Sequence, residues 1–161
     1  MNLFDIVGPV MVGPSSSHTA GAVRIGQVSR HLLGESVKEA KILLHGSFLA
    51  TGKGHGTDKA LVAGLLGMAA DDIRIPDSFD IAKESGVKFE IGKIQLKNAH
   101  PNSVKLLLVG ESGRNLEIVA CSLGGGRIKI CTIDGLEANF SGEYTTCLLY
   151  TSDAADDRIS V

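Results

Sequence analysis

Helical and strand-like patterns occupy different halves of this sequence. Apolar residues recur at helical spacing over residues 19–33 and 58–68, and a short third helix is expected over residues 77–84. One early strand, residues 37–44, leads into a glycine-rich loop. Short β-type runs separated by glycine-containing turns follow at residues 87–91, 104–109, 116–121, 127–133 and 136–140. This order favours an α+β fold, with helices packed on a mostly antiparallel sheet, over an alternating α/β fold.

The charge balance and the length of the apolar stretches argue against two classes of partner, nucleic acid and membrane. The chain has 161 residues, with 16 Lys plus Arg against 18 Asp plus Glu, so its net charge is −2. A nearly neutral domain is a poor nucleic-acid binder, because phosphate neutralisation needs clustered cations. The longest apolar stretch, residues 60–70, is shorter than the ~20 residues that span a bilayer. We therefore expect neither nucleic acid nor membrane as a partner.

Cysteine usage points to a reducing compartment. The chain has 3 cysteines, and none of them forms a C-x-x-C pair. This pattern argues against a disulfide framework and against a complete zinc or iron–sulfur site within the chain. The N-terminus has no basic stretch followed by an apolar core, so no signal peptide is expected. The cytoplasm is the simplest location.

The last residues continue no pattern in the rest of the chain. Residues 147–161 contain no glycine and follow directly on what reads as the start of a new strand, residues 143–146. They resemble a peptide that arises when sequencing adapter is translated at the end of a truncated gene fragment. We therefore expect a single domain over residues 1–146 and a non-native tail over residues 147–161. The alternative is a disordered C-terminal tail.

The first polar segment, residues 13–19, leads into a helix start. Its polar side chains are those of Ser15, Ser16, Ser17, His18 and Thr19. Hydroxyl groups, one imidazole and the free N–H groups of a helix start together form a ready anion site, suited to a carboxylate or a phosphate. The alternative is a well-capped helix with an incidental histidine.

The second polar segment, residues 51–58, does not match a phosphate-binding loop. Gly46 and Gly52 enclose five residues rather than four, and Gly54 follows Lys53 where a Ser or Thr should hold magnesium.

Its alternating glycines would instead let the backbone approach a ligand closely. The loop presents Lys53 and His55 next to another helix start, for which Thr57 is a possible cap. His55 could serve as a general base, because imidazole titrates near neutrality. The alternative is a flexible surface loop.

Two further segments are more ambiguous. In residues 98–102, His100 is held extended before a proline and Asn102 can form a turn, so this segment is more often a turn than a site. Three consecutive glycines in residues 122–127 are most often a bulge or tight turn. We assign His31 and His45 to structural positions.

Taken together, the motifs resemble one enzyme family. The segments that carry the resemblance are residues 4–22, Gly46-Ser47-Phe48, residues 52–58, His100-Pro101-Asn102 and Ser122-Leu123-Gly124-Gly125-Gly126. Their order and spacing are similar to those of the β chain of iron–sulfur-dependent L-serine dehydratases (L-serine ammonia-lyases). The resemblance covers residues 1 to about 146, and motifs this long in this order leave little room for chance.

The resemblance implies a reaction and a partner. The family converts L-serine to pyruvate and ammonia without pyridoxal phosphate. A [4Fe–4S] cluster lies on cysteines of a separate α chain, and one of its irons acts as a Lewis acid on the departing hydroxyl. The implied assembly is a hetero-oligomer in which this chain holds no metal and is inactive alone. The β domain should resemble the allosteric substrate-binding domain of some phosphoglycerate dehydrogenases, and an ACT-type regulatory domain would begin near Thr145.

The resemblance also implies roles for individual residues. His55 is expected to abstract the α-proton, and His18 to act with the serines in holding or orienting the substrate carboxylate. The substrate-binding residues are expected to be Ser15, Ser16, Ser17, Thr19, Lys53 and Asp58. His100 and Asn102 would form a second, regulatory contact, and Cys121 and Cys131 match no cluster motif and should be small buried residues.

Two other readings stay open. The chain could be a non-catalytic serine-binding regulatory domain of the same complex, with catalysis wholly on the partner. It could also be an anion-binding module without an enzyme partner.

Overall fold

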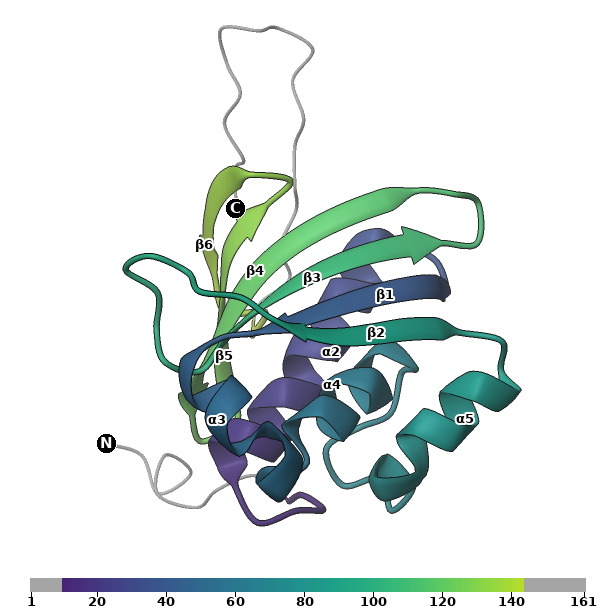
Figure 1. The fold of residues 1–161 in the computed structure, drawn as a ribbon, viewed down its shortest axis with the longest axis horizontal. Helices are drawn as coiled ribbons and strands as arrows, with labels where there is room; N and C mark the ends of the chain where they lie inside the picture. Colours follow the sequence, from purple (N-terminus) through teal and green to yellow (C-terminus); the bar gives the residue numbers. More distant parts are fainter. Residues whose placement is uncertain (1–9, 144–161) are drawn as a thin grey trace, which may run out of the picture.

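The computed structural model describes residues 10–143. The expected domain boundary at residue 146, the tail over residues 147–161 and the start of the first family motif lie outside the described residues. The elements in chain order are η1 (Ser16–Ala20, a π-helix), α2 (Gly21–Leu33), β1 (Val37–Leu44), α3 (Gly46–His55), α4 (Thr57–Leu65), η2 (Ile75–Asp77, a 3-10 helix), α5 (Ser78–Glu84), β2 (Lys88–Lys93), β3 (Ser103–Gly110), β4 (Asn115–Gly124), β5 (Arg127–Ile133) and β6 (Leu136–Phe140) (Figure 1).

The strands form a six-stranded sheet in the order β2-β1-β3-β4-β5-β6. Every neighbouring pair is antiparallel except β1 and β2, which run parallel. The α+β class and the mostly antiparallel sheet are therefore confirmed. The expectation that residues 87–91 belong to the antiparallel series was wrong, because the chain from β1 crosses through α3, α4 and α5 before it returns as β2. Such a crossover is what parallel pairing requires.

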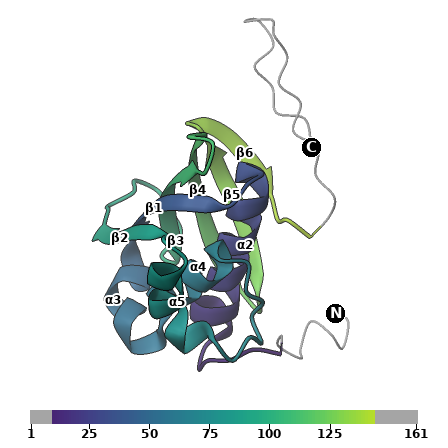
Figure 2. The same cartoon turned by 90° about the vertical axis from the view of Figure 1, so that its right-hand side faces the viewer.

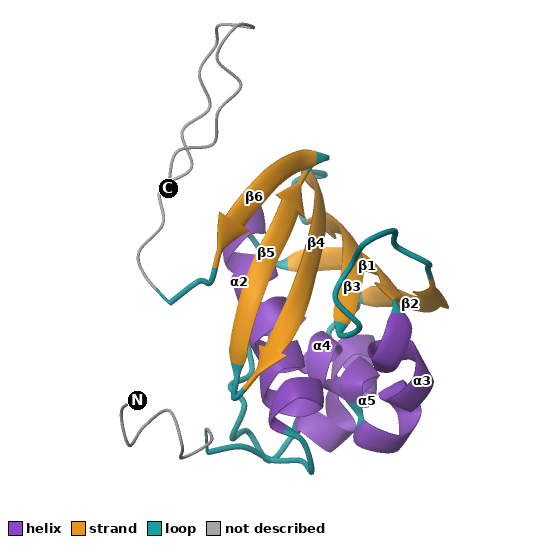
Figure 3. Cartoon of the chain, turned by 90° about the vertical axis from the view of Figure 1, so that its left-hand side faces the viewer, coloured by secondary structure: helices purple, strands orange, loops and turns teal. Residues whose placement is uncertain are grey.

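The helices cover one face of the sheet and leave the other open, as the two side views show (Figures 2 and 3). The inward face is aliphatic, with Ile42, Leu106, Ile118 and Ile130 fully buried. Burial of such side chains contributes about 1.5–3 kcal/mol each. The core is accordingly built without tryptophan.

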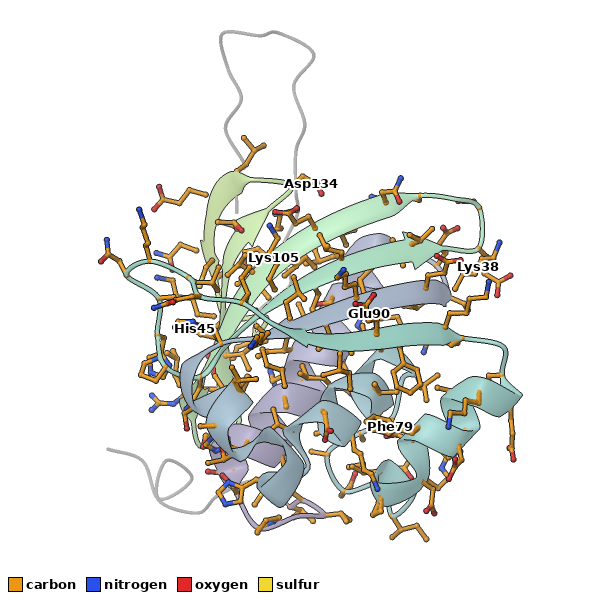
Figure 4. The ribbon with its side chains drawn as sticks, viewed as in Figure 1. Lys38, His45, Phe79, Glu90, Lys105 and Asp134 are labelled. Atoms are coloured by element: carbon orange, nitrogen blue, oxygen red, sulfur yellow. The ribbon has the colours of Figure 1, made fainter. Side chains whose placement is uncertain are left out.

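The open face of the sheet carries charged side chains, among them Glu90 and Lys105 (Figure 4). The Lys105 Nζ lies 2.8 Å from a carboxylate oxygen of Glu117 on the neighbouring strand, and the Lys41 Nζ lies 3.5 Å from one of Glu90. Such half-exposed pairs add little stability. Their side chains are partly exposed, so this part of the face is open to solvent.

The helices α2 and α4 pack closely through glycine. A Cβ atom at Gly26 would lie 2.6 Å from the Leu61 carbonyl oxygen, and one at Gly64 would overlap the Val23 carbonyl oxygen. Both glycines are buried. The two backbones can therefore approach only because neither position carries a side chain.

Several expected elements are confirmed. The strands at residues 37–44, 127–133 and 136–140 match β1, β5 and β6 to the residue. The expected helix over residues 19–33 corresponds to η1 and α2, and it ends at Gly34, whose φ is 79°.

The glycine-rich segment expected as a loop is instead the helix α3. Glycine disfavours helix interiors by about 1 kcal/mol relative to alanine, so tertiary packing holds this helix in place. Phe48 is fully buried, Gly52 is buried, and the Thr51 hydroxyl donates to the Ser47 carbonyl over 2.7 Å. The helix ends at Gly56, whose φ is 68°.

The helix α4 begins without the side-chain cap expected from Thr57. Its N-cap is Gly56 in the left-handed region, and Thr57 is already the first helical residue. The buried Thr57 Oγ1 has no hydrogen-bond partner within the described residues. Side-chain caps need an extended N-cap residue, whereas Gly56 reverses the chain directly from α3 into α4.

The structural assignment of His45 is confirmed. His31 lies exposed on α2. His45 follows β1 (Figure 4), and its Nδ1 accepts a hydrogen bond from the Leu96 N–H over 3.1 Å, which ties down the segment after β2. Within residues 10–143, no helix is long and apolar enough to cross a membrane.

Candidate functional site

Three serine hydroxyls surround the imidazole of His18. The Nδ1 atom lies 3.0 Å from the Ser17 Oγ and 3.2 Å from the Ser15 Oγ, and the Nε2 atom lies 3.1 Å from the Ser47 Oγ. The Ser15 and Ser17 hydroxyls are themselves 3.2 Å apart. We call Ser15, Ser17, His18 and Ser47 the serine–histidine cluster.

The local backbone explains why these groups converge. Ser15 is an extended N-cap residue with a φ of −142°, and its hydroxyl accepts a hydrogen bond from the His18 N–H over 3.2 Å. The π-helix η1 that follows is the wider form of helix that is common at functional sites. Ser15 thus caps the start of η1, while its hydroxyl also contacts His18.

His18 also contacts two rings of α3. Its ring centroid lies 5.5 Å from that of Phe48 and 5.1 Å from that of His55, the latter edge-on. Burial and, to a smaller extent, the neighbouring His55 lower the pKa of His18 below its ordinary 6.5. His18 is therefore neutral near pH 7, with one ring nitrogen donating and the other accepting.

His55 lies at the C-terminal end of α3 and is exposed. It lines a cavity of about 470 Å³, which Thr19 and Asp58 also line. The cavity lies beside the start of α4, and its volume falls in the ~300–1,000 Å³ range of small-molecule sites.

Segments far apart in sequence converge at this end of the sheet. The Ser47 N–H donates to the Pro101 carbonyl over 2.8 Å, and the Ser122 N–H donates to the Asn102 carbonyl over 2.9 Å. The chain thus brings the segments of residues 46–58, 98–102 and 122–126 to the end of the sheet where β1 ends and β3 begins.

The glycine turn after β4 reaches the first polar segment as well. The Gly125 N–H donates to the Ser16 Oγ over 3.3 Å. A Cβ atom at Gly21 would overlap the Ser122 hydroxyl, so α2 starts directly against the end of β4. The expectation of a tight glycine turn at residues 122–127 agrees with the positive φ of Gly124, Gly125 and Gly126, which are 92°, 63° and 77°.

The remaining candidate residues lie at different places. Ser16 bonds the glycine turn rather than His18. Thr19 is buried, and its hydroxyl donates to the His55 carbonyl over 3.5 Å, so it positions the backbone of His55. The Asp58 carboxylate accepts the Lys59 N–H over 2.8 Å at the start of α4. The side chain of Lys53 lies outside the described part of the chain.

His100 and Asn102 lie apart from the serine–histidine cluster. The His100 Nδ1 accepts the Asn102 N–H over 3.1 Å, which closes a turn, and the His100 side chain is exposed. His100 lines a second cavity, of about 510 Å³, between the segment after β2 and the open face of the sheet. The segment of these two candidate regulatory residues is connected to the cluster through the hydrogen bond between the Pro101 carbonyl and the Ser47 N–H.

Ser47 contacts the His18 ring, although the sequence pattern predicts no function for Ser47. It stands in the motif Gly46-Ser47-Phe48, but no role was expected for it. Its hydroxyl bonds the Nε2 of His18, and its neighbour Phe48 packs against the same ring. Its place in the motif Gly46-Ser47-Phe48, directly after a strand, is the signal that could have drawn attention to it.

Comparison with known proteins gives consistent matches. A family model described as Serine dehydratase beta chain matches residues 2–131. The L-serine dehydratase, beta chain, of Peptoniphilus asaccharolyticus is 46% identical over 147 residues, which cover 91% of this chain and 66% of that protein. The probable L-serine dehydratase, beta chain, of Bacillus subtilis (strain 168) is 43% identical over 152 residues, which cover 94% of this chain and 69% of that protein.

The match to a more distant relative covers a smaller share of that relative's length. L-serine dehydratase 1 of Escherichia coli (strain K12) is 30% identical over 155 residues, which cover 80% of this chain and 33% of that protein. The chain spans about two thirds of the length of the two β chains it matches. The resemblance found from the motifs is confirmed, and the chain belongs to the serine dehydratase beta chain family.

Proposed function

We propose that this chain is the β subunit of an L-serine ammonia-lyase, which converts L-serine to pyruvate and ammonia together with an α chain. The family membership supports the substrate and the partner. The single observation that carries a catalytic role is the pair of imidazoles 5.1 Å apart, one held by serine hydroxyls and the other exposed beside a cavity. A cytoplasmic location belongs to the same proposal.

The proposed [4Fe–4S] cluster does not fit the residues of this chain. Such clusters are usually held by four cysteine thiolates, and the chain has 3 cysteines in all. Cys121 and Cys131 line the second cavity, not the one beside His55. Within residues 10–143, no three His, Cys, Asp or Glu side chains are grouped as metal ligands. We therefore assign the cluster ligands to the α chain and derive no step through the cluster here.

The serine–histidine cluster suits the binding of an amino-acid carboxylate. The Ser15 and Ser17 hydroxyls can rotate to donate to a carboxylate oxygen while His18 stays neutral. The N–H groups at the start of η1 add to the favourable field for an anion. The substrate carboxylate would thus be bound beside His18.

His55 suits the abstraction of the α-proton. Because His18 is neutral, the charge that His55 gains on accepting a proton meets no neighbouring imidazolium 5.1 Å away. Loss of the α-proton and the β-hydroxyl converts serine to 2-aminoacrylate, and water converts that product to pyruvate and ammonium. Proton transfer by a positioned imidazole contributes about 10²–10⁴-fold in rate.

The test is His55→Ala in the complex of this chain with its α chain. We expect kcat for serine deamination to fall by about 10²–10⁴-fold with a smaller change in KM. His31→Ala, at an exposed position on α2, is the matched control and should retain kcat. Unchanged kcat in a folded His55→Ala complex would remove His55 as the base.

A second candidate function is that of a non-catalytic serine-binding domain. The exposure of His55 favours it, because a residue that only contacts an effector does not need to be shielded from solvent. In that case His55→Ala shifts the serine concentration of half-maximal activity and leaves kcat in place. The kinetic separation of kcat from KM therefore decides between the two.

A further inference from the structure

Two cysteine side chains meet on the open face of the sheet. The Sγ atoms of Cys121 on β4 and Cys131 on β5 lie 3.9 Å apart, and both are free thiols. Cys121 is buried, as the sequence led us to expect, whereas Cys131 is only half-buried. The expectation that Cys131 is a buried apolar residue was therefore wrong.

A β-bulge brings these side chains together. Ile130 pairs with Ala120 and Thr132 pairs with Val119, so Cys131 is an extra residue on β5 without a partner on β4. Along β5, Ile130 is buried while Cys131 and Thr132 are both half-buried, which places two successive side chains toward the open face. Re-aiming a side chain in this way is the usual effect of a bulge.

The pair is accessible through the second cavity. This cavity has a volume of about 510 Å³ and is lined by both cysteines and by the segment between β2 and β3. Its charged and titratable lining residues are Lys97 and His100 from that segment, Lys129 from β5 and Glu137 from β6. The thiols are thus open to a small molecule, although Cys121 itself lies within the fold.

The two thiols ionise as a unit. A hydrogen bond from the Cys121 thiol stabilises a thiolate at Cys131 and, with a smaller contribution from Lys129, lowers the pKa of Cys131 to about 7. The same hydrogen bond and burial raise the pKa of Cys121. Near neutral pH a substantial fraction of the more exposed sulfur, that of Cys131, is therefore thiolate, and the thiolate is the form that reacts with disulfides.

We propose that Cys121 and Cys131 form a reversible modification site, at which a low-molecular-weight disulfide entering the cavity converts the two thiols into an intramolecular disulfide. The Cys131 thiolate attacks one sulfur of the small disulfide, breaks its S–S bond and releases one small thiolate. Cys121 then loses its proton and attacks the Cys131 sulfur of the mixed disulfide. The second small thiol leaves, so that two protein thiols are oxidised and one small disulfide is reduced to two thiols.

The geometry allows this closure. The sulfurs must approach from 3.9 Å to the ~2.05 Å of a disulfide bond. Cys131 lies outside the regular strand pairing, so the bulge can absorb the shift without breaking the ladder. The disulfide would lie next to Ser122 in sequence. The Ser122 N–H donates to the Asn102 carbonyl, at the same end of the sheet as the serine–histidine cluster.

The test uses the full chain carrying Cys147→Ser, so that Cys121 and Cys131 are the only thiols. The reduced protein is incubated with oxidised glutathione near neutral pH, digested with trypsin and analysed by mass spectrometry. Cleavage after Arg127 and Lys129 separates the two cysteines into different peptides. We expect these peptides to be joined, with the loss of two hydrogen atoms, and to separate again with dithiothreitol.

The single variants supply the controls. Cys121→Ser should stop at a glutathione adduct on Cys131, and Cys131→Ser should react far more slowly, because the remaining thiol, that of Cys121, is buried. A folded chain that stays reduced, or that stops at a stable adduct on Cys131 with Cys121 intact, would overturn the proposal. The readout involves no turnover, so the result is independent of the proposed function.

Discussion

At the scale of single residues, the site depends on the protonation of His18. Three hydroxyls lie within 3.2 Å of its ring nitrogens, and His55 lies edge-on to it. A neutral ring can bond hydroxyls as both donor and acceptor, whereas an imidazolium can only donate. Burial and the proximity of His55 both favour the neutral form.

We predict that His55→Ala raises the pKa of His18, because one of the two causes that lower it is removed. The measurement is a proton NMR titration of the histidine Cε1–H signals in the reference chain and the variant. His31→Ala should leave the His18 midpoint in place. An unchanged or lower midpoint in His55→Ala would contradict the interaction between the two rings.

The same shift has a consequence for stability. The pKa of His18 in the folded chain lies below its ordinary 6.5, so the unfolded chain binds more protons at mildly acidic pH. His18 therefore contributes stability that is present above the ordinary pKa and is lost as the pH falls below it.

At the scale of elements, tertiary packing overrides the low helix propensity of glycine. Three glycines lie within or at the start of α3, yet the helix forms, because Phe48 is buried beneath it. Glycine also sets the separation of α2 and α4, where the Gly64 position faces the Val23 carbonyl. These two helices position η1 and the start of α4. They therefore also position the groups from η1 and α4 that line the cavity beside His55.

We predict that Gly64→Ala lowers the free energy of unfolding by about 1–3 kcal/mol, because the added methyl group overpacks the contact between the helices. Chemical denaturation followed by circular dichroism measures the change. The matched control is Gly54→Ala, since a Cβ at Gly54 meets nothing within 4 Å among the described residues. Equal stability of both variants would show that α2 and α4 can move apart freely.

At the scale of the whole molecule, the proposed function divides the catalytic site between this chain and the α chain. The serine–histidine cluster and His55 lie at one end of the sheet, and His55 is exposed there. Its relatives named as β chains extend beyond the length that this chain matches. Under the proposed function, the exposure of His55 and the assignment of the cluster ligands to the α chain together put the complete catalytic site at a junction between the two chains.

We predict that the purified chain alone shows no serine deamination and that addition of the α chain restores it. Pyruvate formation from L-serine is the measurement, with the α chain alone as the control. Turnover by this chain without a partner would contradict the proposed division of the site.

Much of the fold could be predicted because it depends on local patterns. Alternation of apolar residues located β1, β5 and β6 to the residue, and the order of patterns gave the α+β class. The serine cap at Ser15 also follows from local hydrogen bonding within one turn. The motifs located most of the candidate site, but they did not show that Ser16 and Ser17 bond different partners.

The sequence by itself determined the strands at residues 37–44, 127–133 and 136–140, the helix that ends at Leu33 and the segments that carry polar side chains, because those properties depend mainly on neighbours along the chain. Only the tertiary structure decided that β2 runs parallel to β1, that α3 is helical, that Ser47 bonds His18, and that Cys121 meets Cys131. Each of these depends on contacts between segments distant in sequence. Such contacts are set by the packing of the whole core, and no pattern within a short stretch of sequence encodes them.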